Sequence, residues 1–284
     1  MRVWVVLLAF VIIGFFCGIA LAQDSSKPSS PVERVDLPVE KPIKPDNDKG
    51  SGDDDKGGSG DDDDADDNEE PPVEFFDNEI KANKFVYVMD KTGSMSGRVG
   101  HPITDEKGNV ISNPTKWQQI KAEFKKSVLG LGENAKFTAL VYSGYATSPG
   151  DIVVWRTTLQ KATPENKASA MAWIEGFSPY SVTPIWDATK RALDIPEVET
   201  ILLHTDGVAN VYDGSYHGES YSAVVNNCDV TKSRIIPAAK AKGVKIHTFA
   251  HALSSFYSPD VAAVGEQMLK DIAAGTGGTF TKVN

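Results

Sequence analysis

The sequence predicts an α/β fold with a doubly wound, mostly parallel central sheet and helices on both faces. Strand-like and helical segments alternate along the chain from about residue 73 onward. Two short apolar runs, residues 84–89 and 200–204, have the composition of strands that are buried on both faces. The helical segments carry their apolar residues on one stripe, as helices do when one face packs on a sheet. This alternation is typical of an open parallel sheet joined by helical crossovers.

The first elements of this region are a strand and a helix. Residues 84–89 form a short apolar run, which predicts a buried strand. Residues 115–129 place Trp117, Ile120 and Phe124 at helical spacing, so this stretch predicts a helix with one apolar face.

The following segments continue the alternation. Residues 136–142 and 151–157 are strand-like runs on either side of a Ser/Gly/Pro loop, which is the pattern of a hairpin. Apolar residues align on one side of residues 164–177 and predict a helix. Another helix is expected to begin at Pro184, because proline is favoured in the first turn. The apolar run 200–204 then predicts a second buried strand.

The C-terminal part begins with a polar segment, residues 210–228, that is expected to be a long loop. A helix over 231–241 and a strand over 244–250 follow. A last helix is indicated by apolar residues that share one face: Val261, Val264, Met268 and Ile272. Residues 279–283 predict the closing strand.

The N-terminus has the features of an export signal. Arg2 precedes an unbroken apolar run over residues 3–22, which ends in Ala-Leu-Ala, a small-x-small cleavage pattern. We therefore expect residues 1–22 to be a signal peptide and the mature protein to be secreted, periplasmic or held at the cell surface. Since about 20 apolar residues can span a bilayer, an uncleaved anchor that tethers the domain to the membrane is the alternative.

A linker is expected over residues 23–72, between the signal and the domain at 73–284. Residues 23–45 are rich in Pro and Ser, and residues 46–70 contain 13 acidic residues against two lysines. Such low-complexity composition favours a disordered, solvated segment, although the aspartates could also gather Ca²⁺ loosely. This tract carries nearly all of the net charge of −10, so the remainder is almost neutral. No basic face stands out, which argues against a nucleic-acid partner.

The sequence gives little support to catalysis by the protein's own side chains. Cleavage of the signal would leave Cys228 as the sole cysteine, a free thiol in a polar loop with no catalytic partner in view. His204, His247 and His251 are better explained as packed or hydrogen-bonded residues than as a zinc site. The Gly-x-Ser-x-Gly, His-Glu-x-x-His and phosphate-loop motifs do not occur. No catalytic residue and no organic cofactor are therefore assigned.

Three separated segments carry acids and hydroxyls at positions where ligands bind in such folds. Asp90, Thr92 and Ser94 directly follow the first core strand, Thr183 precedes a helix, and Asp206 follows the strand 200–204. In a doubly wound sheet, ligands bind beyond the carboxyl ends of the strands, where the strand order reverses. Taken singly, each segment also has a structural explanation, because Asp and Thr cap helices and Asp-Gly forms turns.

Together, Asp-x-Thr-x-Ser, a distant Thr and a later Thr-Asp-Gly resemble the metal-ion-dependent adhesion site of von Willebrand factor A domains. The resemblance covers about residues 80–284 and extends to Met-Leu-Lys-Asp-Ile-Ala at 268–273 and Thr-Gly-Gly at 276–278. It implies that the first and fourth core strands are neighbours in the sheet. It also implies a set of metal ligands: Asp90, Thr92, Ser94, Thr183 and Asp206. The sequence departs from the family pattern in having Thr92 where serine is commoner, but the hydroxyl is kept.

The donor set suits Mg²⁺, with Mn²⁺ or Ca²⁺ as alternatives. Mg²⁺ is a hard cation that takes about six oxygen ligands and keeps some of its waters. Three hydroxyls supply oxygen without charge, so an ion that the two carboxylates hold indirectly stays electron-poor. We expect such an ion to take up an Asp or Glu carboxylate from a protein partner, in adhesion or assembly.

Two other functions remain open at this point, and the sequence does not indicate an oligomeric state. The cation could assist a hydrolytic reaction, or the domain could be a structural component of an envelope or surface complex whose metal only stabilises the fold. The segments 98–114 and 210–228 are expected to be long loops, and both leave the predicted metal-bearing end of the sheet. The second is rich in Tyr and Ser, residues that suit contact surfaces. Disordered or packing insertions are the alternative for both.

Overall fold

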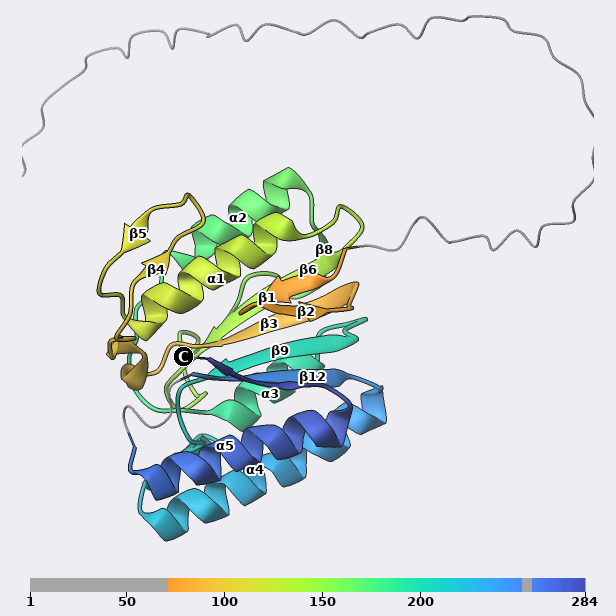
Figure 1. Ribbon diagram of the computed structural model, residues 1–284. Helices are drawn as coiled ribbons and strands as arrows, with labels where there is room; N and C mark the ends of the chain where they lie inside the picture. The colour runs from red at the N-terminus through yellow and green to blue at the C-terminus, as the bar shows by residue number, and fades with distance from the viewer. Residues whose placement is uncertain (1–70, 252–256, 284) are drawn as a thin grey trace, which may run out of the picture. The chain divides into compact units, whose positions relative to one another are not determined.

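A computed structural model describes residues 71–251 and 257–283 of the chain. Within these ranges the main sheet has seven strands in the order β13-β12-β9-β3-β6-β7, with β8 paired to β6 (Figure 1). Strands β3, β6, β9, β12 and β13 are parallel to one another, and β7 and β8 run antiparallel to β6. The predicted doubly wound, mostly parallel sheet is confirmed. The first and fourth core strands, β3 and β9, are neighbours, as expected.

The bounds of the elements follow the alternation in the sequence. The main-sheet strands are β3 Lys84–Asp90, β6 Lys136–Tyr142, β7 Ile152–Val154, β8 Gln160–Lys161, β9 Thr200–Thr205, β12 Lys245–His251 and β13 Phe280–Val283. The described residues form five α-helices: α1 Lys116–Gly130, α2 Pro164–Ile174, α3 Ile185–Leu193, α4 Tyr221–Lys242 and α5 Pro259–Thr276. Three small hairpins complete the fold: β1–β2 (Val73–Phe75, Asn78–Ile80), β4–β5 (Ile103–Thr104, Val110–Ile111) and β10–β11 (Val211–Tyr212, Ser215–Tyr216).

Helices cover both faces of the sheet and give the domain two cores (Figure 1). Alternate residues of β3 divide between them, because successive side chains of a strand point to opposite faces. Phe85 and Tyr87 pack with α1 and α2, whereas Val86 and Val88 pack with α3, α4 and α5. Burying each such side chain stabilises the fold by roughly 1.5–3 kcal/mol, which explains why β3 reads as a continuous apolar run.

The β1–β2 hairpin was not predicted from the sequence. Its turn, Phe76-Asp77, has positive φ at both residues (49° and 56°), and it lacks the glycine that usually announces such a turn. The hairpin extends the aromatic core, since the ring of Phe75 lies 4.8 Å from that of Phe249 and 5.4 Å from that of Tyr87.

Helix α4 begins ten residues before the predicted start at 231, so the predicted loop over 210–228 is wrong in its second half. Ser220 is the N-cap and its side chain accepts a hydrogen bond from the backbone N–H of Ala223. Val224 and Cys228 then lie on the buried side of the helix at helical spacing. The expectation that Cys228 lies in a polar loop is therefore also wrong, and burial raises the pKa of its thiol to about 12. The polar residues between these positions lie on the other face and concealed the helix.

The other differences are small. The predicted hairpin is present as β6–β7, although β7 is shorter than expected, and α2 ends at Ile174 rather than at residue 177. The segment 98–114, which was expected to be a loop, contains the β4–β5 hairpin.

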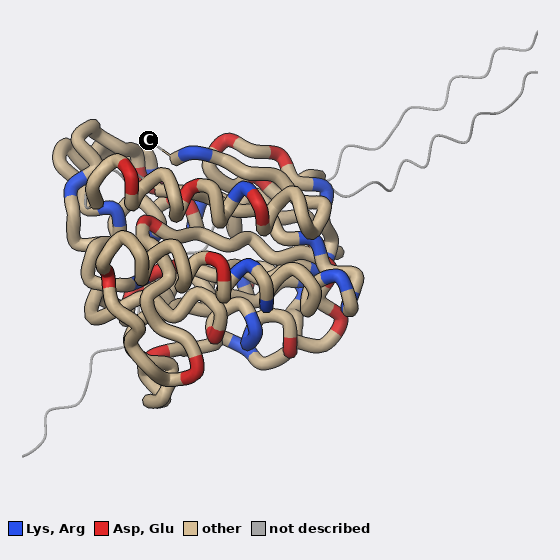
Figure 2. Tube along the Cα trace, turned by 90° about the horizontal axis from the view of Figure 1, so that it is seen from below, with Lys and Arg blue, Asp and Glu red and all other residues tan. Residues whose placement is uncertain are grey.

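Charged residues of both signs are interspersed over the described part of the chain (Figure 2). Many of them form ion pairs between neighbouring elements. Lys121 of α1 lies 2.6 Å from Glu175, which follows α2, and Lys232 of α4 lies 2.9 Å from Asp271 of α5. Such solvent-accessible pairs contribute little individually, about 0–1 kcal/mol each.

The predicted signal at 1–22 and almost all of the predicted linker at 23–72 lie outside the described residues. Among the helices of the described ranges, none is long and apolar enough to cross a membrane.

Candidate metal centre

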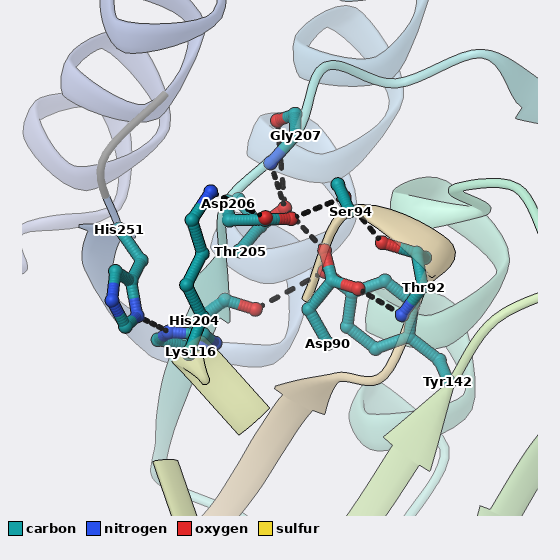
Figure 3. Close-up of polar contacts among 10 residues, drawn as sticks. All are labelled: Asp90, Thr92, Ser94, Lys116, Tyr142, His204, Thr205, Asp206, Gly207 and His251. Carbon is teal, nitrogen blue, oxygen red and sulfur yellow. Dashed lines mark hydrogen bonds and ion pairs between the residues drawn. The ribbon is translucent and has the colours of Figure 1, made fainter. Parts of the chain in front are cut away.

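The two acids predicted to bind metal lie at the same edge of the sheet. Asp90 is the last residue of β3, and Asp206 directly follows the last residue of β9. Because β3 and β9 are parallel neighbours, their carboxyl ends meet and bring the two side chains together (Figure 3). Both residues have no exposed surface. This edge is the expected ligand-binding position of a doubly wound sheet.

Hydrogen bonds fix the Asp90 carboxylate from two sides. Its Oδ1 accepts the backbone N–H of Thr92 at 2.7 Å. Its Oδ2 accepts the hydroxyl of Thr205 at 2.6 Å and that of Tyr142 at 3.3 Å (Figure 3). The carboxylate is therefore held in one orientation by its own loop and by both neighbouring strands.

The Asp206 carboxylate is held in the same way by Ser94 and Lys116. The hydroxyl of Ser94 donates to Oδ1 of Asp206 at 2.6 Å, and the hydroxyls of Ser94 and Thr92 lie 3.1 Å apart. The ammonium of Lys116 lies 2.8 Å from Oδ2 (Figure 3). Four of the five predicted ligands, Asp90, Thr92, Ser94 and Asp206, thus belong to one hydrogen-bonded cluster.

Thr183 lies beside this cluster. A β-carbon at Gly207 would be 3.4 Å from the hydroxyl oxygen of Thr183, which places that oxygen next to the turn after Asp206. The backbone N–H of Thr183 donates to the side chain of Asn210 at 2.7 Å. The N-cap of α3 is Pro184 rather than Thr183, and the N-cap of the short 3-10 helix Gly93–Ser96 is Thr92 rather than Asp90. The helix-capping explanation of Asp90 and Thr183 is therefore not supported.

Backbone contacts join the first two loops of the site. The N–H of Gly93 donates to the carbonyl of Ser181 at 2.9 Å, and the N–H of Tyr180 donates to the carbonyl of Lys91 at 2.9 Å. A side chain at Gly93 would crowd the carbonyl of Ser181, because its β-carbon would lie only 3.3 Å away. The glycine between Thr92 and Ser94 therefore permits the close approach of the first loop to the loop that precedes Thr183.

The electrostatics of the site favour the addition of positive charge. Burial, followed by the nearby charge of Asp206, raises the pKa of Asp90 to about 7. Burial also raises the pKa of Asp206, against the opposing effect of Lys116. Two carboxyls that resist ionisation, surrounded by neutral hydroxyl oxygens, form an all-oxygen donor set that fits a hard divalent cation. The described residues contain no group of three or more His, Cys, Asp and Glu side chains placed to hold a metal, so hydroxyls are essential to this assignment.

Several polar residues of the site were not identified as such from the sequence. Lys116 is the first residue of α1, and nothing in its neighbourhood distinguishes it from a surface lysine, yet it is only 1% exposed. Tyr142 lies at the end of an apolar strand and Asn210 in a polar loop. Their roles depend on which strands are neighbours, and a motif search could not have found them.

The histidines near the site are packed and hydrogen-bonded, as the sequence indicated. His204 Nε2 and His251 Nδ1 lie 3.1 Å apart, and both rings are fully buried. Burial lowers the pKa of His251 to about 3 and that of His204 well below its ordinary value. His247 contacts the hydroxyl of Thr279 instead, at 2.8 Å. Neither buried ring reaches a surface from which it could act as a general base on a substrate.

Comparison with known proteins gave matches at the level of fold only. No family model and no curated protein sequence matched the chain. A solved von Willebrand factor type A protein from Catenulispora acidiphila is similar, with 15% identity and a TM-score of 0.44 over 72% of this chain and 40% of that one. Two structures of the pilus adhesin SpaC from Lactobacillus rhamnosus GG, one of them an open conformation, have 13% and 14% identity and TM-scores of 0.47. They cover 70% of this chain, which spans only 28% and 27% of theirs.

The class of the domain follows from its own topology. The doubly wound sheet, the two helical layers and the meeting of β3 and β9 at the acidic edge agree with what the sequence and its resemblance to von Willebrand factor A domains predict. The described domain therefore has a doubly wound α/β fold that is similar to that of von Willebrand factor A domains.

Proposed function

We propose that this domain is a protein-binding module that holds one divalent cation, Mg²⁺ in the first instance, and offers it to an acidic group of a partner protein. The observation that carries the proposal is the gathering of two buried carboxyls and three hydroxyls from three distant segments: Asp90, Thr92, Ser94, Thr183 and Asp206. Mn²⁺ and Ca²⁺ prefer the same oxygen donors and are the alternatives.

The chain's own residues would orient the site before the cation arrives. Thr205, Tyr142 and the N–H of Thr92 hold Asp90, while Ser94 and Lys116 hold Asp206. When bound, the cation would act as an electron-poor centre that an incoming carboxylate completes. A partner that binds in this way would lose its affinity when the metal is removed.

The setting of the module would be outside the cytoplasm, in adhesion or in the assembly of a surface complex. This part of the proposal rests on the export signal predicted at residues 1–22 and on the acidic linker predicted after it. The linker would carry the domain away from a membrane or wall if the N-terminus remains anchored.

The proposal is tested by capture of proteins from the extracytoplasmic fraction of the native cells. The immobilised domain is compared in Mg²⁺ and in EDTA, together with Ser94→Ala, which removes one hydroxyl donor to Asp206. Ser233→Ala on the exposed side of α4 is the matched control. We expect wild type and the control to retain a partner in Mg²⁺ and release it in EDTA, and Ser94→Ala to remain folded without retaining it.

Equal capture in Mg²⁺ and in EDTA would refute the proposed function. If Ser94→Ala instead unfolds, and Mg²⁺ stabilises the wild type without changing capture, the metal has only a structural role.

A further inference from the structure

A buried lysine occupies the candidate metal centre. Lys116 is the first residue of α1, and its backbone N–H donates to the carbonyl of Gly97 at 2.8 Å. Its aliphatic stem packs against Gly97, and its ammonium lies 2.8 Å from Oδ2 of Asp206. The two side chains are 1% and 0% exposed. The ammonium is therefore a built-in charge of the site.

Withdrawing an ammonium from water is costly, and an apolar side chain of the same size often replaces a buried ion pair without loss of stability. The position of Lys116 thus calls for an explanation other than stability. The other buried lysine nearby, Lys91, donates to the hydroxyl of Ser143 at 2.6 Å and lies 3.9 Å from the ring centre of Tyr180. The charge of Asp151 acts on Lys91 more strongly than that of Asp90 does. Among the described residues, Lys116 is the cation that forms an ion pair with a predicted metal ligand.

We infer that Lys116 sets the charge of the loaded centre, so that the bound cation keeps a net positive charge for an anionic partner. The inference rests on the proposed function and deepens it. Asp90 and Asp206 together would cancel the two charges of a divalent ion. Because the ammonium already balances Asp206, the centre with its ion carries one uncompensated positive charge. A carboxylate from the partner neutralises it, whereas a neutral ligand does not.

This assignment predicts opposite effects on metal and on ligand. Removing the ammonium leaves two uncompensated carboxylates, so Mg²⁺ should bind more tightly. It also leaves a neutral loaded centre, so an anion should bind more weakly. A residue with a merely structural role would weaken both when it is replaced. Lys116 is thus a specificity-determining residue for an anionic partner rather than a metal ligand.

The test uses Lys116→Gln, which removes the charge but keeps a hydrogen-bond donor, and Lys116→Met, which keeps only the stem. Lys121→Met is the matched control, because Lys121 lies on the same helix and pairs with Glu175 away from the site. Mg²⁺ affinity is measured by calorimetry on the metal-free protein. Acetate binding to the Mg²⁺-loaded protein is followed by nuclear magnetic resonance, with acetamide as the neutral probe.

We expect both neutral variants to bind Mg²⁺ about tenfold or more tightly than wild type, because the repulsion between the ammonium and the divalent ion would be lost and such repulsion is strong at an effective dielectric constant of about 20. Acetate should bind about fivefold or more weakly to the Mg²⁺-loaded variants than to the Mg²⁺-loaded wild type. The affinity for acetamide should be the same in all of these proteins. Lys121→Met should bind Mg²⁺ and acetate as the wild type does.

Four results are distinguished. A wild type that binds no Mg²⁺ overturns the proposed function itself. A wild type that binds Mg²⁺, with variants whose Mg²⁺ and acetate affinities are unchanged or both reduced, overturns the inference and leaves the function standing. If a neutral variant folds only in Mg²⁺, the cation is replacing the lost charge, and the acetate titration decides. If neither variant folds even in Mg²⁺, Lys116 is structural and the inference is wrong.

Discussion

Replacing Asp90 by asparagine should stabilise the metal-free domain while abolishing its response to Mg²⁺. Asp90 is fully buried and lies beside a second acid, so its ionised form is disfavoured without a cation. The rise of its pKa from 3.8 to about 7 corresponds to roughly 4 kcal/mol lost by the folded state above neutral pH. Asparagine removes this charge but keeps one of the two acceptor oxygens. The lost hydrogen bonding should take back roughly 1–3 kcal/mol, which leaves a gain of about 2 kcal/mol.

The pH dependence of this gain follows from the direction of the shift. Between about pH 4 and pH 7, the folded wild type holds a proton on Asp90 that the unfolded chain has released, so its stability falls as the pH rises through this window. The advantage of Asp90→Asn should therefore be largest at about pH 8 and disappear near pH 5. The buried histidines, His204 and His251, have lowered pKa values and destabilise both proteins equally in acid, so they cancel in the difference.

The assay is urea denaturation of both proteins at about pH 5 and pH 8, in EDTA and in excess Mg²⁺. Wild type should gain about 3 kcal/mol at pH 8 when Mg²⁺ is about a hundredfold above its dissociation constant, and the variant should gain nothing. The reasoning is refuted if Asp90→Asn is less stable than wild type in EDTA at pH 8. It is also refuted if Mg²⁺ stabilises both proteins equally.

Three further predictions concern other parts of the domain. Phe75→Ala should lower the free energy of unfolding by about 3–5 kcal/mol in urea denaturation, because Phe75 is 1% exposed and its ring contacts several other aromatic rings. A loss under about 1 kcal/mol would mean that the β1–β2 hairpin is not part of the core. Cys228 should resist iodoacetamide in the native protein and react only on unfolding, because its thiol is buried and burial raises its pKa to about 12. Rapid labelling of the native protein, detected by mass spectrometry, would contradict its buried position in α4. Tyr216→Ala should weaken partner capture several-fold without changing the Mg²⁺ affinity, because Tyr216 is 44% exposed on the β10–β11 hairpin that follows Asp206. Unchanged capture would exclude this hairpin from the contact surface.

The sequence predicted the core strands and the position of the acids well because both depend on short-range patterns. Residues 84–89 are apolar since β3 is buried on both faces, and Asp90 follows because the strand must end where polar groups begin. The same pattern holds for β9 and Asp206. The family resemblance then related two segments more than 100 residues apart, which local periodicity alone could not do.

What the sequence did not predict depends on tertiary contacts. The polar residues of α4 between Tyr221 and Cys228 outweighed the spacing of its few buried side chains, so the helix was taken for a loop. The turn of the β1–β2 hairpin lacks glycine. Lys116 resembles any lysine that begins a helix, and its role becomes visible only once Asp206, which follows β9, is known to contact the start of α1. Buried charges of this kind are recognised from their partners, and these were distant in the chain.

The proposed metal centre is tested most directly by anomalous diffraction from crystals grown with Mn²⁺, which accepts the same oxygen donors as Mg²⁺. We expect one anomalous peak between the carboxyls of Asp90 and Asp206, within reach of the hydroxyls of Ser94 and Thr183. No peak at this edge of the sheet, or a peak only among other acidic residues, would contradict it.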